Sequence, residues 1–81
     1  MNNAEALGRM KVACRKTKDL IRDFILSGIM YDGTRDSQKR IQLAMVRGWM
    51  MDELEKRDPD AWESWLDSNL DDDGLLQYFH C

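Results

Sequence analysis

The N-terminal third of the chain carries apolar residues at helical spacing. The face that they define contains Leu7, Met10, Cys14, Thr17, Ile21, Phe24 and Gly28. Apolar positions three and four residues apart are typical of an amphipathic helix. The pattern predicts one helix from about Ala4 to about Ile29, which ends at Ser27-Gly28 and the following turn at 31–33.

A second helix is predicted from about Asp36 to Arg57, with Thr34, Asp36 and Ser37 as candidate N-caps. Its apolar residues form two stripes on opposite sides. One stripe contains Ile41, Ala44, Met45 and Gly48, and the other contains Leu43, Val46, Met50 and Leu54. A helix that is apolar on both sides lies at the centre of its assembly. We therefore expect this helix to be central, and its surplus face to form a homodimer.

The pair Asp58-Pro59 separates the second helix from a third. The residue before a proline is disfavoured in a helix, whereas proline fits the first helical position and aspartate caps it. The third helix is predicted from Pro59 to about Asn69, and the apolar residues of 75–79 predict a short C-terminal helix or a docking tail. The sequence thus predicts an all-α single domain over residues 1–81, a small bundle of three main helices plus this short helix or tail.

Composition supports a folded chain. Of the 81 residues, 43% are hydrophobic and 33% are charged, and only one is proline. No apolar run reaches the ~18–20 residues that cross a bilayer, and the N-terminus has no signal-peptide pattern. We therefore expect a cytoplasmic protein without a membrane segment.

Charge is divided unevenly along the chain. Residues 1–48 hold ten basic and five acidic side chains, for a net charge of +5, and residues 49–81 hold two basic and ten acidic ones, for a net charge of −8. The two values add to the formal net charge of −3. Such an asymmetry indicates an interaction surface. The two halves can face each other within a chain, across a dimer, or each can face a separate partner.

Four basic residues are spaced as one stripe on the first predicted helix: Lys11, Arg15, Lys18 and Arg22. Such a stripe is the electrostatic pattern of a nucleic-acid binder. It also fits pairing with the acidic half or a solvated surface, and the sequence pI near 5.0 argues against a dedicated nucleic-acid protein. A small dimeric nucleic-acid-associated regulator is the alternative function that follows from this stripe.

Residues with catalytic or metal-binding chemistry are few. Asn69, Asp71, Asp73 and Gly74 have the spacing of a calcium loop, but His80 stands where a bidentate glutamate is required. Cys14 lies on the apolar stripe, where it acts as a small hydrophobe. Two cysteines and one histidine fall short of the four ligands of a structural zinc site. We expect no enzyme activity, no cofactor and no metal.

The leading hypothesis is a non-enzymatic protein-binding module, an adaptor or a stoichiometric inhibitor. Its acidic C-terminal half would engage a basic partner protein, such as a nucleic-acid enzyme, while tryptophan and methionine supply contact energy. In general appearance the chain is similar to small helical proteins of phages and other mobile elements, which often modulate a host protein. The predicted partner-binding residues are Trp49, Met50, Asp52, Glu53, Asp60, Glu63, Asp67, Asp71, Asp72 and Asp73.

Overall fold

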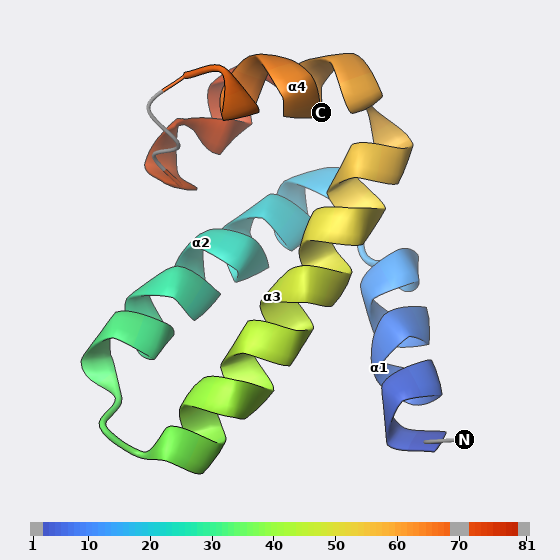
Figure 1. Ribbon diagram of the computed structural model, residues 1–81. Coiled ribbons are helices and arrows are strands. Elements are labelled where there is room, and N and C mark those ends of the chain that lie inside the picture. Colours follow the sequence, from blue (N-terminus) through green and yellow to red (C-terminus); the bar gives the residue numbers. More distant parts are fainter. Residues whose placement is uncertain (1–2, 69–71, 80–81) are drawn as a thin grey trace.

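A computed structural model describes residues 3–68 and 72–79, and in these ranges the protein is helical without strands (Figure 1). The elements are α1 (Asn3–Cys14), α2 (Thr17–Gly33), α3 (Ser37–Arg57), α4 (Pro59–Leu66) and the 3₁₀ helix η1 (Asp72–Gln77). Figure 1 shows α2 and α3 side by side, with α4 and η1 across one end. The all-α class is confirmed. None of these helices is both long enough and apolar enough to cross a membrane.

The first predicted helix is wrong, because the chain breaks at residues 15–16 and forms two helices in its place. The Arg15 N–H turns back to the Val12 carbonyl at 3.2 Å, and Lys16 takes an extended conformation. The break leaves α1 free to pack on α3 while α2 buries its own apolar face. As a result, Leu7, Met10 and Cys14 of the predicted apolar stripe are exposed.

Helix α2 continues through the predicted stop at Gly28 and ends at Gly33. The hydroxyl of Ser27 is buried and donates to the Phe24 carbonyl at 2.6 Å. The guanidinium of Arg47 on α3 donates to the same carbonyl and to the Ser27 hydroxyl, both at 3.0 Å. These bonds give the buried polar atoms partners at the α2–α3 contact.

Helix α3 is central, as predicted, and contacts α1, α2 and α4. Its N-cap is Asp36, whose carboxylate accepts from the Gln38 N–H at 3.0 Å. Of its two apolar stripes, the one with Met50 and Leu54 faces the core, whereas Ile41 and Met45 are exposed. A homodimer through the exposed stripe stays a prediction.

The C-terminal elements complete the core. Asp58 caps α4 by accepting from the Ala61 N–H at 3.0 Å, and Pro59 is the first residue of that helix. The docking of the C-terminal segment is confirmed, because Leu75 and Phe79 are buried. The buried apolar residues are Val12, Leu20, Ile21, Phe24, Met50, Leu54, Ala61, Trp62, Trp65, Leu75 and Phe79.

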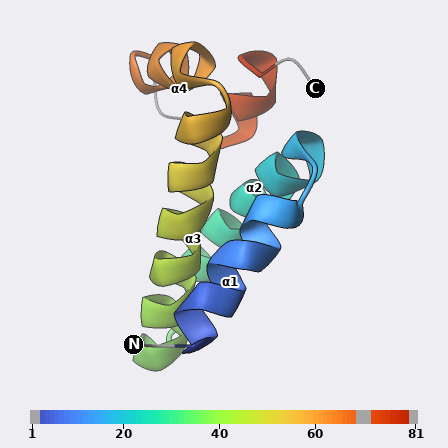
Figure 2. The same ribbon diagram turned by 90° about the vertical axis from the view of Figure 1, so that its right-hand side faces the viewer.

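Helix α1 rests on α3 through a glycine and a tryptophan. Gly8 lies against the indole ring of Trp49, and the guanidinium of Arg9 stands 5.9 Å from the centre of that ring. A side chain at position 8 would place its Cβ 2.9 Å from Cη2 of Trp49, closer than real Cβ contacts. The absence of a side chain at Gly8 therefore sets the distance between α1 and α3. Figure 2 shows α1 on the side of the molecule that faces the viewer, next to α3.

We expect Gly8→Ala to lower the free energy of unfolding by about 1 kcal/mol. The displaced indole costs about 1–3 kcal/mol, and the better helix propensity of alanine offsets up to about 1 kcal/mol. The control is Gly48→Ala in α3, where nothing lies within 4 Å and the change should stabilise by about 0.5–1 kcal/mol. Urea unfolding measures both, and an equal shift in the two variants would contradict the close contact.

Candidate functional site

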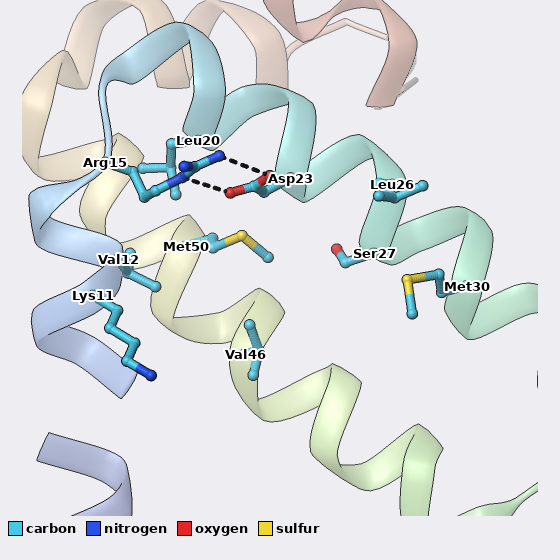
Figure 3. A pocket seen from close by; sticks show the side chains of 10 residues that line it. All are labelled: Lys11, Val12, Arg15, Leu20, Asp23, Leu26, Ser27, Met30, Val46 and Met50. Carbon is cyan, nitrogen blue, oxygen red and sulfur yellow. Dashed lines mark hydrogen bonds and ion pairs between the residues drawn. The ribbon is translucent and has the colours of Figure 1, made fainter. Parts of the chain in front are cut away.

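A groove opens where α1 and α2 diverge from the break at residues 15–16, and α3 forms its floor. Figure 3 looks into it, with Val12 of α1 on one side, Met30 of α2 on the other, and Val46 and Met50 of α3 between them. This part has a volume of about 300 Å³. Its lining consists of Lys11, Val12, Arg15, Leu20, Asp23, Leu26, Ser27, Met30, Val46 and Met50.

The groove continues along α3 toward the α2–α3 turn. A second hollow of about 300 Å³ shares Met30 and Val46 with the first and adds Lys39, Gln42 and Leu43. A third shares Met30, Lys39 and Leu43 with the second and reaches the turn at 33–34. From Lys39 to Met50 the floor is about 16 Å long, at 1.5 Å per helical residue. We call this continuous surface the α1–α2 groove.

Apolar side chains dominate the α1–α2 groove. On its α2 wall, Leu26 is 54% exposed and Met30 is 52% exposed. Large apolar groups exposed beside a hollow are typical of interaction sites rather than of a closed core. Methionine is suited to such a surface, because its unbranched side chain adapts to different partners.

Charged side chains at the edge of the groove are mainly basic. The Arg15 guanidinium is paired with Asp23, with Nε–Oδ2 and Nη2–Oδ1 distances of 2.9 Å and 3.3 Å (Figure 3). Lys11 on α1 and Lys39 on α3 also line the groove, and neither forms an ion pair with a described residue. Three cations and one carboxylate give the lining a net charge of +2.

The predicted apolar contacts of a partner lie mostly inside the molecule. Met50 is only 3% exposed: it packs in the core and also lines the floor of the groove, and its contact with a partner stays a prediction. Met50 is buried because the stripe of α3 that contains it packs in the core, whereas the opposite stripe is exposed. Trp49 is half-buried against Gly8, so it holds α1 on α3.

The predicted acidic contacts are scattered. Glu53 is largely buried, and its Oε2 lies 2.8 Å from Nε of Arg57. Asp52 is exposed, and its Oδ2 lies 3.6 Å from Nη1 of Arg9. The exposed carboxylates of Asp60, Glu63 and Asp67 lie on and just after α4, where they form no ion pair with another described residue. We call these three residues the α4 acidic face. The predictions for Asp71 and for the side chains of Asp72 and Asp73 lie outside the described part.

The predicted basic stripe is not a single stripe. Lys11 is on α1, Arg15 is in the break, and Lys18 and Arg22 are on α2. Arg15 is also neutralised by Asp23. The break that separates α1 from α2 therefore divides the surface on which nucleic-acid binding was predicted.

Side chains that could hold a metal do not gather in the described ranges 3–68 and 72–79. No group of three or more His, Cys, Asp or Glu residues there has a suitable arrangement. Asn69, Asp71, His80 and Cys81, on which the calcium and zinc considerations rested, lie outside these ranges. Cys14 is exposed at the end of α1 instead of packing as a small hydrophobe.

The α1–α2 groove was missed by the sequence analysis. Its signal is the pair Leu26 and Met30, four residues apart and beside the main apolar face of α2.

No family model, curated protein or solved structure matches this chain. The function therefore has to be argued from the geometry of the groove.

Proposed function

We propose that this chain is a non-enzymatic protein-binding module, of the adaptor or stoichiometric-inhibitor kind, that docks a partner segment in the α1–α2 groove. The observation that carries the proposal is the exposure of Leu26 and Met30 along an apolar hollow. Burying one such side chain against a partner contributes about 1.5–3 kcal/mol. A few anchors of this size supply most of the energy of a typical protein contact.

Nucleic-acid binding has less support than protein binding. The basic residues of the predicted stripe are divided between two helices, and Arg15 is paired with Asp23. The floor of the groove is apolar, whereas a phosphate backbone is bound by rows of basic and polar groups. We therefore do not retain the nucleic-acid alternative.

The α4 acidic face is a second proposed contact, for a basic partner. Asp60, Glu63 and Asp67 are three and four residues apart, so they lie on one side of α4. Exposed charges of one sign accelerate the association with an oppositely charged protein more than they add affinity. An adaptor with this face and the groove would present two surfaces of different chemistry.

The test is a displayed library of random peptides of about 12 residues, selected on the full chain. We expect Met30→Glu to weaken the selected peptides by about tenfold or more, since it puts a charge into the apolar wall. The matched control is Ile29→Glu on the same helix, which is 63% exposed but does not line the groove. Peptides that are weakened equally by both variants, or a selection that enriches none, would refute docking in the groove.

A further inference from the structure

We infer that the α1–α2 groove binds an acidic amphipathic α-helix of a partner protein. This inference rests on the proposed function and specifies the occupant of the same groove. The dimensions give the first argument. A floor of about 16 Å matches about 11 helical residues, or three turns. The floor residues Leu43, Val46 and Met50 are three and four positions apart, so they form a ridge that a second helix can pack against.

The chemistry of the groove walls favours a helix over an extended peptide. An added strand needs an unpaired sheet edge, and the described residues form only helices, whose backbone groups bond within each helix. A proline-rich segment needs aromatic walls, and none of the described residues that line the groove is aromatic. Helix-in-groove docking needs only apolar side chains along about three turns, which Leu26, Met30 and Val46 help to supply.

Charge identifies the occupant as acidic. Lys11 lies on the α1 wall and Lys39 at the opposite end of the floor, where it also lines the hollow that reaches the α2–α3 turn. Neither amine has an ion-pair partner among the described residues, whereas Arg15 has Asp23. A helix with glutamates or aspartates flanking its apolar face would place opposite charges beside both lysines.

A second copy of the chain is a poorer occupant. Its exposed apolar pairs include Leu7 with Met10 on α1 and Ile41 with Met45 on α3. Both pairs belong to stretches with more basic than acidic residues, since 3–14 holds two against one and 37–48 holds three against none. On the acidic α4, Trp62 and Trp65 are already buried in their own core. Leu66 is the one large apolar side chain that α4 exposes, so no helix in the described part of a second copy has both an acidic surface and a row of exposed apolar side chains.

The experiment uses three fluorescently labelled peptides of about 14 residues and the full chain. One is an acidic amphipathic helix of leucine, alanine and glutamate, the second has lysine for glutamate, and the third scrambles the acidic one so that its leucines share no face. Fluorescence polarisation measures the affinities at low and physiological salt. We expect the acidic helix to bind at least about tenfold more tightly than the other two, and to weaken with salt.

Charge reversal at the groove provides the decisive variant. Lys11→Glu with Lys39→Glu should reverse the preference, so that the basic helix binds more tightly. The control is Lys18→Glu with Lys56→Glu, which makes the same charge change at exposed residues outside the lining and should keep the acidic preference.

Equal binding of the acidic and basic helices, or an unchanged preference in the reversed variant, would overturn the inference. If neither helix binds but library-selected peptides still depend on Met30, the module proposal stands and the acidic helix is refuted. If no selected peptide depends on Met30, the proposed function itself fails.

Discussion

Phe24→Ala should lower the free energy of unfolding by about 3–5 kcal/mol. Phe24 is 1% exposed, and its ring packs edge-on against Trp65 with the ring centres 6.1 Å apart. The Arg47 guanidinium stands 4.3 Å from the centre of the same ring. A helical protein of this length has a total stability of about 4–12 kcal/mol, at about 0.05–0.15 kcal/mol per residue. The substitution therefore removes a large share of it, because the site joins α2, α3 and α4.

Urea unfolding followed by far-ultraviolet circular dichroism measures this loss. The matched control is Ile29→Ala on the same helix, where the side chain is largely exposed and the expected change is below about 0.5 kcal/mol. If Phe24→Ala fails to fold, Phe24→Leu keeps most of the volume and should cost about 1 kcal/mol. Similar losses at positions 24 and 29 would contradict the central place of Phe24 in the core.

Local side-chain chemistry explains why α3 and α4 were predicted from the sequence. Asp36 and Asp58 accept hydrogen bonds from backbone N–H groups two or three residues later, and Pro59 follows Asp58. These signals depend on the immediate neighbours alone, so the sequence carries them in full. The central place of α3 followed from its two apolar sides, which is again a property of one segment.

The break between α1 and α2 has no such local signal. Residues 14–17 contain neither glycine nor proline, and the N-cap Lys16 makes no capping hydrogen bond with its side chain. The carbonyl groups of Val12 and Ala13 at the end of α1 accept hydrogen bonds from Arg57, which is 45 and 44 residues away in sequence. Tertiary contacts therefore decided against the continuous helix that the spacing predicted.

The candidate groove could not be predicted for the same reason. Its walls exist because α1 and α2 diverge from the break, and the angle between them is set by their packing on α3. The sequence predicted an excess of apolar surface on α3, where Ile41 and Met45 are exposed, and it assigned the partner contact to Trp49 and Met50, but it gave no role to the apolar residues of the groove wall on α2. The structure buries Met50, half-buries Trp49, and exposes Leu26 and Met30 of α2.

Arg57→Ala should lower the free energy of unfolding by about 2–3 kcal/mol and loosen the packing of α1. The guanidinium binds the Glu53 carboxylate at 2.8 Å and donates to the carbonyls of Val12 at 3.3 Å and Ala13 at 3.1 Å, and to the Thr17 hydroxyl at 3.2 Å. A charged hydrogen-bond donor contributes about 1.5–3 kcal/mol to stability, and its loss leaves the Glu53 carboxylate without its ion-pair partner. Breaking a fully buried ion pair costs about 3–5 kcal/mol. The side chains of Arg57 and Glu53 are 19% and 17% exposed, so water partly solvates the remaining charge and the expected loss is smaller.

Arg9→Ala is the control for this prediction, because its ion pairs with Glu5 and Asp52 are exposed and contribute at most about 1 kcal/mol. Urea unfolding gives the stability, and hydrogen exchange of α1 shows whether that helix opens before the rest. Equal losses in the Arg57 and Arg9 variants would contradict the role of Arg57. Since α1 forms one wall of the groove, Arg57→Ala should also weaken groove-binding peptides, although Arg57 does not line the groove. That result would tie the break at residues 15–16 to the function proposed for the groove.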